Sequence, residues 1–335
     1  MRLARAGVRN SALRIVLAVL PVLALASACQ GSGSGTSGAT GPLTVAVVPG
    51  IDNAPLRVAV QEGLFRQQGL DVTIKNYPSL TAELQGLTSG QAQIAAGDYT
   101  SFFYAQATGR TPLKLIADGQ DAAADSIAIL TLPSSGITTP QQLSGQPGGV
   151  ATMPAQVIPY SATIPYDIET LAAEEVLQND GVSPSSVTWT QVPANQMISS
   201  LHSGKVKAIL ATEPYILQAE EQLGAVEVVD ASAGVTSGLP LSGYFSLSSY
   251  AQSHSAEVRA FQQVLGQAQS DSAQRGLVQD VLPQLTGMSL ADAAQVTLGT
   301  FPASLNVGQV QRVATLMYDS AMIRNPVSVS ALATR

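Results

Sequence analysis

The sequence predicts an α/β protein built as two lobes, each a mostly parallel sheet flanked by helices. Three observations lead to this fold class. Of the 335 residues, 45% are hydrophobic and only 12% are charged, so the chain can bury a large core. The chain is also longer than the roughly 250 to 300 residues at which a single core stops growing. Finally, short β-branched runs alternate with segments of helical periodicity, which is typical of βαβ units.

The first predicted lobe begins with a β-branched strand at 43–48, which Pro49-Gly50 ends. Apolar residues at helical spacing follow, with Pro55 in the first turn of the helix and Gly69 after its end. A strand at 71–75 completes a βαβ unit. The pattern then predicts a helix at 81–89, a strand at 94–96 and a helix from Thr100. Parallel strands gather their loops at one edge of the sheet, so we expect a cleft there.

The second predicted lobe repeats this plan. A strand starts at Val150, and apolar residues between 168 and 176 share one face of a helix. A strand at 187–192, a helix at 195–203 and a strand at 208–211 follow. The motif Leu87-Thr88-Ser89-Gly90 precedes Asp98 much as Leu201-His202-Ser203-Gly204 precedes Glu213. This echo indicates two similar lobes that face each other.

The region after about residue 230 is predicted to be mostly helical and to return to the first lobe. Residues 43–125 with 228–335 would then form lobe 1, and residues 126–227 would form lobe 2. The chain would cross between the lobes near 125–128 and near 226–230. Two such crossings make a two-strand hinge and favour closure about one axis.

The amino-terminal residues have the pattern of an export signal. Residues 1–28 contain four arginines and no acidic side chain, and residues 15–28 form an apolar stretch of 14 residues. This is shorter than the roughly 20 residues that span a bilayer, so it predicts a signal peptide. The sequence Leu25-Ala26-Ser27-Ala28-Cys29 resembles the lipobox of bacterial lipoproteins, which implies lipidation of Cys29. Residues 29–42 are rich in Gly, Ser and Thr and predict a flexible tether.

The charge balance excludes a nucleic-acid partner. From Cys29 onward the chain has 12 basic and 23 acidic side chains, a net charge of −11. Such a surface repels phosphate backbones. The single cysteine also excludes a disulfide framework within the chain.

A set of short motifs extends over almost the whole chain after Pro42. They are Ala54-Pro55-Leu56, Glu62-Gly63-Leu64-Phe65, Gly69-Leu70-Asp71-Val72, Leu87 to Gly90 leading to Gly97-Asp98, Leu143-Ser144-Gly145, Leu201 to Gly204 leading to Glu213-Pro214, Gly238-Leu239-Pro240 and Ser242-Gly243-Tyr244. Together they resemble the solute-binding proteins of ABC importers, in the group with nitrate-, taurine-, aliphatic-sulfonate- and thiamine-precursor-binding members. The resemblance implies a two-lobed periplasmic-binding-protein-like fold of type II. It also implies a monomer outside the cytoplasmic membrane that captures a small solute and delivers it to a permease powered by a separate ATPase.

The predicted cleft contains both helix amino ends and carboxylates. Free N–H groups at Asn53-Ala54 and Thr100-Ser101 would suit an oxyanion such as nitrate or a sulfonate. However, acidic residues occupy the same loops, and like charges are costly at a low effective dielectric. Carboxylates with tyrosine rings favour a pyrimidine-like or amine-bearing solute. The predicted ligand-binding residues are Asp52, Asn53, Asp98, Tyr99, Thr100, Tyr166, Glu213 and Tyr244.

Each predicted site residue also has an ordinary structural interpretation. Asn53, Asp98 and Thr100 suit helix caps, and Glu213 before Pro214 suits a solvated turn. The tyrosines suit core positions with a hydrogen-bonded hydroxyl.

Two other functions remain open. One is an enzyme on the same fold, lyase or pyrimidine-forming, with Asp98 or Glu213 as general base. The other is a ligand-sensing lipoprotein. His202 and His254 have no Cys or acidic partner at metal-ligand spacing, so the sequence predicts no catalytic residue, no metal and no cofactor.

Overall fold

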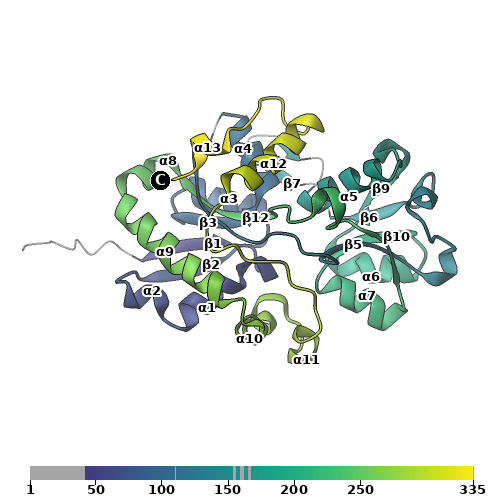
Figure 1. Ribbon diagram of the computed structural model, residues 1–335, viewed down its shortest axis with the longest axis horizontal. Coiled ribbons are helices and arrows are strands. Elements are labelled where there is room, and N and C mark those ends of the chain that lie inside the picture. Colours follow the sequence, from purple (N-terminus) through teal and green to yellow (C-terminus); the bar gives the residue numbers. More distant parts are fainter. Residues whose placement is uncertain (1–41, 110, 154–155, 159–161, 165–166, 335) are drawn as a thin grey trace, which may run out of the picture. The chain divides into compact units, whose positions relative to one another are not determined.

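The computed structural model describes residues 42–109, 111–153, 156–158, 162–164 and 167–334 (Figure 1). The predicted signal peptide, Cys29, the tether before residue 42 and Tyr166 lie outside these residues. Gly41–Arg335 forms one compact unit.

The first sheet has the strand order β2-β1-β3-β12-β4. The strands are β1 (Leu43–Val47), β2 (Val72–Asn76), β3 (Ile94–Asp98), β4 (Leu113–Asp118) and β12 (Ser242–Leu247). β1 pairs in parallel with β2 and β3, whereas β12 pairs antiparallel with β3 and β4. The first three strands match the predicted ones, and β12 lies in a region where the sequence predicted mainly helices.

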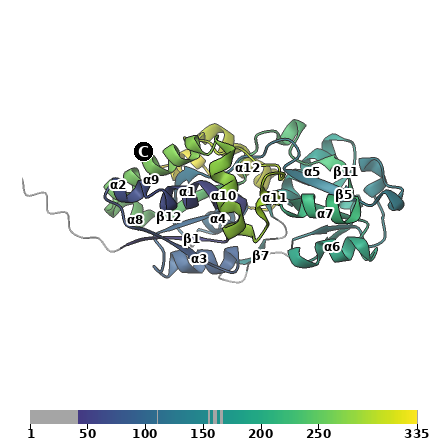
Figure 2. The same cartoon turned by 90° about the horizontal axis from the view of Figure 1, so that it is seen from below.

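Helices cover both faces of this sheet (Figures 1 and 2). On one face, β1 residues pack against Leu56, Phe65 and Phe261, which α1, α2 and α9 supply. On the other face, Ala46 and Ala95 pack with residues of α3, α4 and α12. The bounds are α1 (Ala54–Gln61), α2 (Leu64–Gln67), α3 (Leu80–Thr88), α4 (Tyr99–Ala107), α9 (Ser255–Asp271) and α12 (Val307–Asp319).

The second sheet has the strand order β11-β5-β10-β6-β9. Its strands are β5 (Ile127–Thr131), β6 (Val150–Thr152), β9 (Trp189–Gln191), β10 (Ala208–Thr212) and β11 (Val226–Asp230). β6 pairs in parallel with β9 and β10, and β5 pairs antiparallel with β10 and β11. Residues of α5 (Ile168–Asn179) pack on one face, and those of α6 (Ala194–His202) and α7 (Tyr215–Leu223) pack on the other.

Shorter elements complete the chain. A hairpin of β7 (Gln156–Ile158) and β8 (Ala162–Ile164) follows β6. After β12 come α8 (Ser248–Ser253), α10 (Arg275–Thr286), α11 (Leu290–Ala293) and α13 (Val329–Leu332). The 3-10 helices are η1 (Ile51–Asn53), η2 (Pro133–Ser135), η3 (Pro140–Leu143), η4 (Pro184–Ser186) and η5 (Gly234–Thr236). Among the described residues, no helix combines the length and apolar character needed to span a bilayer.

Two segments, 119–126 and 231–241, connect the sheets. Backbone hydrogen bonds join the two segments. The Ala122 amide donates to the Leu239 carbonyl at 2.8 Å, and the Leu241 amide donates to the Gln120 carbonyl at 2.8 Å. Because β11 belongs to the second sheet, the return crossing follows Asp230, a few residues later than predicted. The predicted α/β class with two helix-flanked sheets is confirmed. Each sheet is mixed, because β12 adds antiparallel pairings to the first sheet and β5 adds them to the second.

Candidate functional site

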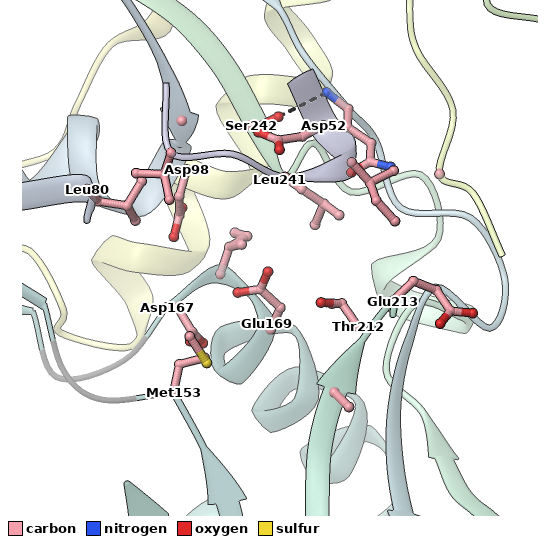
Figure 3. A pocket seen from close by; sticks show the side chains of 18 of the residues that line it. Asp52, Leu80, Asp98, Met153, Asp167, Glu169, Thr212, Glu213, Leu241 and Ser242 are labelled. Atoms are coloured by element: carbon pink, nitrogen blue, oxygen red, sulfur yellow. Dashed lines mark hydrogen bonds between the residues drawn. The ribbon is translucent and has the colours of Figure 1, made fainter. Parts of the chain in front are cut away.

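A cavity of about 380 Å³ lies between the two sheets, as Figure 3 shows from close by. Loops after β1 and β3 of the first sheet line it, and so do residues that follow β6 and β10 of the second sheet. The crossing segments add Gln120, Ser126 and Leu241, and β12 adds its first residue, Ser242. Thr297 and Gly299 come from the loop after α11. The loop edges of both sheets, where the sequence predicted a cleft, contribute described residues to this cavity.

Acidic side chains dominate the polar lining. The carboxyl groups are those of Asp52, Asp98, Asp167, Glu169 and Glu213. Among the described lining residues there is no Lys, Arg or His. Asp52, Asp98 and Glu213 are among the predicted site residues, whereas Asp167 and Glu169 are not. The sequence feature that could have identified Glu169 as a lining residue is its position in the first turn of α5, two residues after Asp167, which caps that helix.

Asp98 caps α4 at the edge of the cavity. Its Oδ1 accepts from the backbone amide of Thr100 at 2.6 Å and from the Thr100 hydroxyl at 2.8 Å. Thr100 is fully buried and serves this cap. Asp167 caps α5 in the same way, since its Oδ1 accepts from the Thr170 amide at 2.9 Å and the Thr170 hydroxyl at 2.8 Å.

These caps bear on the predicted oxyanion site. A free helix amino end attracts an anion through its N–H groups and dipole. At α4 and α5 a carboxylate of the protein already takes that place. The capping carboxyl groups of Asp98 and Asp167 therefore occupy the positions at which a bound oxyanion would meet these two helix ends.

Asn53 orients the neighbouring Asp52. The Asn53 side chain is buried, and its Nδ2 donates to the Val48 carbonyl at 2.8 Å and to Asp52 Oδ1 at 3.0 Å. Asn53 occupies the N-cap position of α1 but its side chain makes no capping hydrogen bond. Asn53 does not line the cavity, whereas Asp52 does.

Tyr99 and Tyr244 lie in the hydrophobic core and do not line the cavity. The Tyr99 hydroxyl donates to Asp118 Oδ1 at 2.6 Å, and its ring packs against Phe103 and Phe245. The Tyr244 ring packs against Phe261. Among the described lining residues, Tyr215 supplies the one aromatic ring. Tyr166 lies outside the described residues.

Glu213 joins the second sheet to the loop after α11. Its Oε1 accepts from the Thr297 amide at 2.9 Å, and its Oε2 accepts from the Leu217 amide in α7 at 3.1 Å. That loop is held from the first-lobe side, because the Arg275 guanidinium donates to the carbonyls of Ala294 and Val296. Both oxygens of Glu213 are thus engaged by backbone amides.

Burial and mutual repulsion raise the pKa values of the cavity acids. Burial raises the pKa of Asp52 to about 7, against opposing hydrogen bonds. Burial, together with the charge of Asp167, raises the pKa of Asp98 to about 7. Burial and then the charges of Asp167 and Asp98 raise the pKa of Glu169 well above its ordinary value. A site of this kind stabilises a bound proton or cation.

Glu83 is a further acid directly behind the cavity wall. It is fully buried on α3, and neither of its carboxyl oxygens makes a hydrogen bond. A Cβ atom at Gly97, which lines the cavity, would lie 3.0 Å from Glu83 Oε2. Burial, and then the charge of Asp52, raises the pKa of Glu83 well above its ordinary value.

The described carboxylates do not converge on one point. Within the described part of the chain, no group of three or more His, Cys, Asp or Glu side chains is arranged to hold a metal ion. The acids instead line a cavity with room for a small organic molecule.

Comparison with known proteins identifies the family. The model of the family described as NMT1/THI5 like matches residues 51–275, which is more than half of the chain. The chain belongs to the NMT1/THI5-like family. A curated relative is the nitrate import ATP-binding protein NrtC of Synechocystis, 26% identical over 196 residues. That match covers 56% of this chain and 29% of NrtC, so the chain spans less than a third of that relative.

Solved structures share the fold. The alkanesulfonate-binding protein SsuA of Xanthomonas axonopodis pv. citri, bound to MOPS, has a TM-score of 0.68 and 19% identity, covering 89% of this chain and all of SsuA. The periplasmic nitrate-binding protein NrtA of Synechocystis has a TM-score of 0.68 and 14% identity, covering 87% of this chain and 86% of NrtA. The expected periplasmic-binding-protein-like fold is confirmed.

Proposed function

We propose that this protein is the extracytoplasmic solute-binding component of an ABC importer. It captures a small organic solute between its sheets and delivers the solute to a permease that a separate ATPase powers. The observation that carries the proposal is the cavity of about 380 Å³ lined by both sheets. Two crossing segments join those sheets, which suits closure around a guest molecule. The family match and the names of the similar structures support the same role.

The solute bears a positively charged, N–H-bearing group. Five carboxyl groups line the cavity, and no described lining residue is basic. An anion placed there would face like charges in a partly dry site, whereas an ammonium group would gain charge-assisted hydrogen bonds. Residues 127–230, which form the second sheet, contain 10 acidic and two basic side chains, so this part of the chain also attracts cations.

An amine fits the described lining better than a flat pyrimidine-like ring. A stacked heterocycle needs aromatic faces, and Tyr215 is the one ring among the described lining residues. The apolar lining, which includes Leu80, Ile168 and Leu241, suits methylene groups. Alkyl groups with cationic nitrogen atoms match both kinds of surface.

The location and anchoring follow from the sequence pattern. Lipidation of Cys29 would hold the protein at the outer face of the cytoplasmic membrane, with residues 29–42 as tether. The folded part then acts as a monomer that meets its permease by diffusion on that surface.

Native mass spectrometry of the purified protein tests the proposal. The expected result is one co-purifying organic cation per monomer, together with a melting temperature that rises with added solute by mass action. A folded, ligand-free protein that no amine stabilises would contradict it. Release of a chemically altered solute would instead favour the enzyme alternative.

A further inference from the structure

The carboxylates of the cavity come from two opposing walls. Asp52 follows β1 and Asp98 is the last residue of β3 in the first sheet, and Asp167 and Glu169 lie at the amino end of α5 on the second sheet. Figure 3 shows Asp52 and Glu169 on opposite sides of the open space. Closure of the sheets therefore brings two acidic walls together, and their repulsion opposes closure unless positive charge lies between them.

Behind the wall of the first sheet lies another acidic side chain with no positively charged partner among the described residues, that of Glu83. Glu83 is fully buried and lacks a hydrogen-bond partner for either oxygen. A buried, unpartnered carboxyl group is costly to the folded state. The Glu83 carboxyl group lies directly behind Gly97 of the cavity wall, and the charges of Asp52 and Asp98 act on it, so a cation bound at this wall would relieve the cost.

The wall of the second sheet also has a carboxyl group that faces the cavity. Asp167 already accepts two hydrogen bonds from Thr170, and Glu213 accepts two from backbone amides. Glu169, in contrast, lines the cavity with its carboxyl group near Asp167 and Asp98. One cation at the first wall would leave this second group of acids without a partner.

We propose that the solute is a small organic dication, with one ammonium group bound at the Asp52 side of the first wall and the other at Glu169 on the second. This inference rests on the proposed function and specifies its substrate class. The apolar side chains of Leu80, Ile168 and Leu241 line the same cavity and suit the alkyl linker between the two nitrogen atoms. The two ends of the ligand would then join the two walls.

Isothermal titration calorimetry with a defined series of probes tests the inference. The probes are diaminoalkanes from 1,3-diaminopropane to 1,6-diaminohexane, n-butylamine, taurine and sodium nitrate. We expect at least one diamine to bind at least about tenfold more tightly than n-butylamine, because its second ammonium group makes a second charge-assisted contact. Taurine and nitrate should not bind.

Matched variants assign the two ends. Glu169→Gln and Asp52→Asn should each reduce the preference for the diamine over n-butylamine to within about threefold, because one ammonium group loses its carboxylate. Glu62→Gln, a change at an exposed acid outside the cavity, should leave the preference unchanged. Melting curves of all three variants establish that they are folded.

The outcomes separate this inference from the proposed function. Equal affinity for n-butylamine and the diamines overturns the dication and leaves an amine-binding protein. Binding of taurine or nitrate but of no amine overturns both the dication and the cationic solute. Failure of every diamine to bind also overturns the inference, and co-purification of another solute would still support a solute-binding protein.

Discussion

Asp98 combines two roles at one position. Its Oδ1 caps α4 through Thr100, while its charge contributes to the acidic wall of the cavity. A cap needs an acceptor oxygen but not a charge, since Asn serves nearly as well as Asp. The two roles are therefore separable by substitution.

Asp98→Asn and Asp98→Ala should differ in stability but not in ligand binding. Both remove the charge, so both should weaken binding of an amine by at least about tenfold. Only Ala removes the cap, so it should unfold about 1 kcal/mol more easily than Asn in urea titrations. Equal stability of the two variants would show that the cap contributes nothing.

Glu213 is expected to stabilise contact between the second sheet and the loop after α11. Glu213→Ala leaves the amides of Thr297 and Leu217 without their acceptor, so we expect a loss of about 1 to 3 kcal/mol. Hydrogen exchange at these two amides should become faster. Glu220→Ala, at an exposed position of the same α7 helix, is the control and should change neither measurement.

Among the predicted site residues, the acidic side chains line the cavity, whereas the described tyrosines Tyr99 and Tyr244 do not. Asp52, Asp98 and Glu213 lie at the cavity because loops after parallel strands converge whatever the details of packing. Tyr99 was predicted at the cleft but lies in the core, because its hydroxyl group donates to Asp118, a partner that only the folded sheet brings near. Tyr244 lies on β12, whose position in the sheet was not foreseen.

At the scale of elements, β12 shows why a strand escapes prediction. Its sequence, SGYFSL, opens with Ser and Gly, which are more typical of loops. The structure needs these small residues, because a Cβ atom at Gly243 would lie 2.7 Å from the Tyr99 hydroxyl oxygen. The Ser246 hydroxyl in turn donates to the Gln93 carbonyl at 2.7 Å. Tertiary contacts, absent from a single sequence, decide these choices.

Gly243→Ala should destabilise the protein by about 1 to 3 kcal/mol, since the added methyl group displaces the Tyr99 ring that is held by Asp118. Gly276→Ala in α10 is the control, because a Cβ atom there meets nothing within 4 Å. That control should be neutral or slightly stabilising in the same denaturant titration. Wild-type stability of Gly243→Ala would mean that the first sheet tolerates a shift at this point.

At the scale of the whole molecule, the ligand-free protein should lose stability as the pH rises. Burial raises the pKa of Asp52, Asp98 and Asp121 to about 7 and that of Asp118 to about 6. In the unfolded chain these groups titrate near pH 4. The folded state therefore holds more protons between pH 4 and pH 7, and its stability falls across that window as the pH increases.

Calorimetric melting of the ligand-free protein measures this dependence. We expect a melting temperature lower at pH 8 than at pH 5.5 by on the order of 5 °C. The double variant Asp52→Asn with Asp98→Asn should show a smaller difference, because two of the titrating groups are gone. A melting temperature that instead climbs over this range would contradict the raised pKa values.

The insertion of β12 between β3 and β4 has a consequence for biosynthesis. The second sheet comes from one uninterrupted stretch, 127–230, and can form as soon as that stretch has left the ribosome. β4, with the apolar sequence LKLIAD, pairs along its length with β12 and must wait until Leu247 has been made. The strand β4 therefore stays without its partner strand while the second sheet is synthesised, and it is a segment that a chaperone would protect during that time.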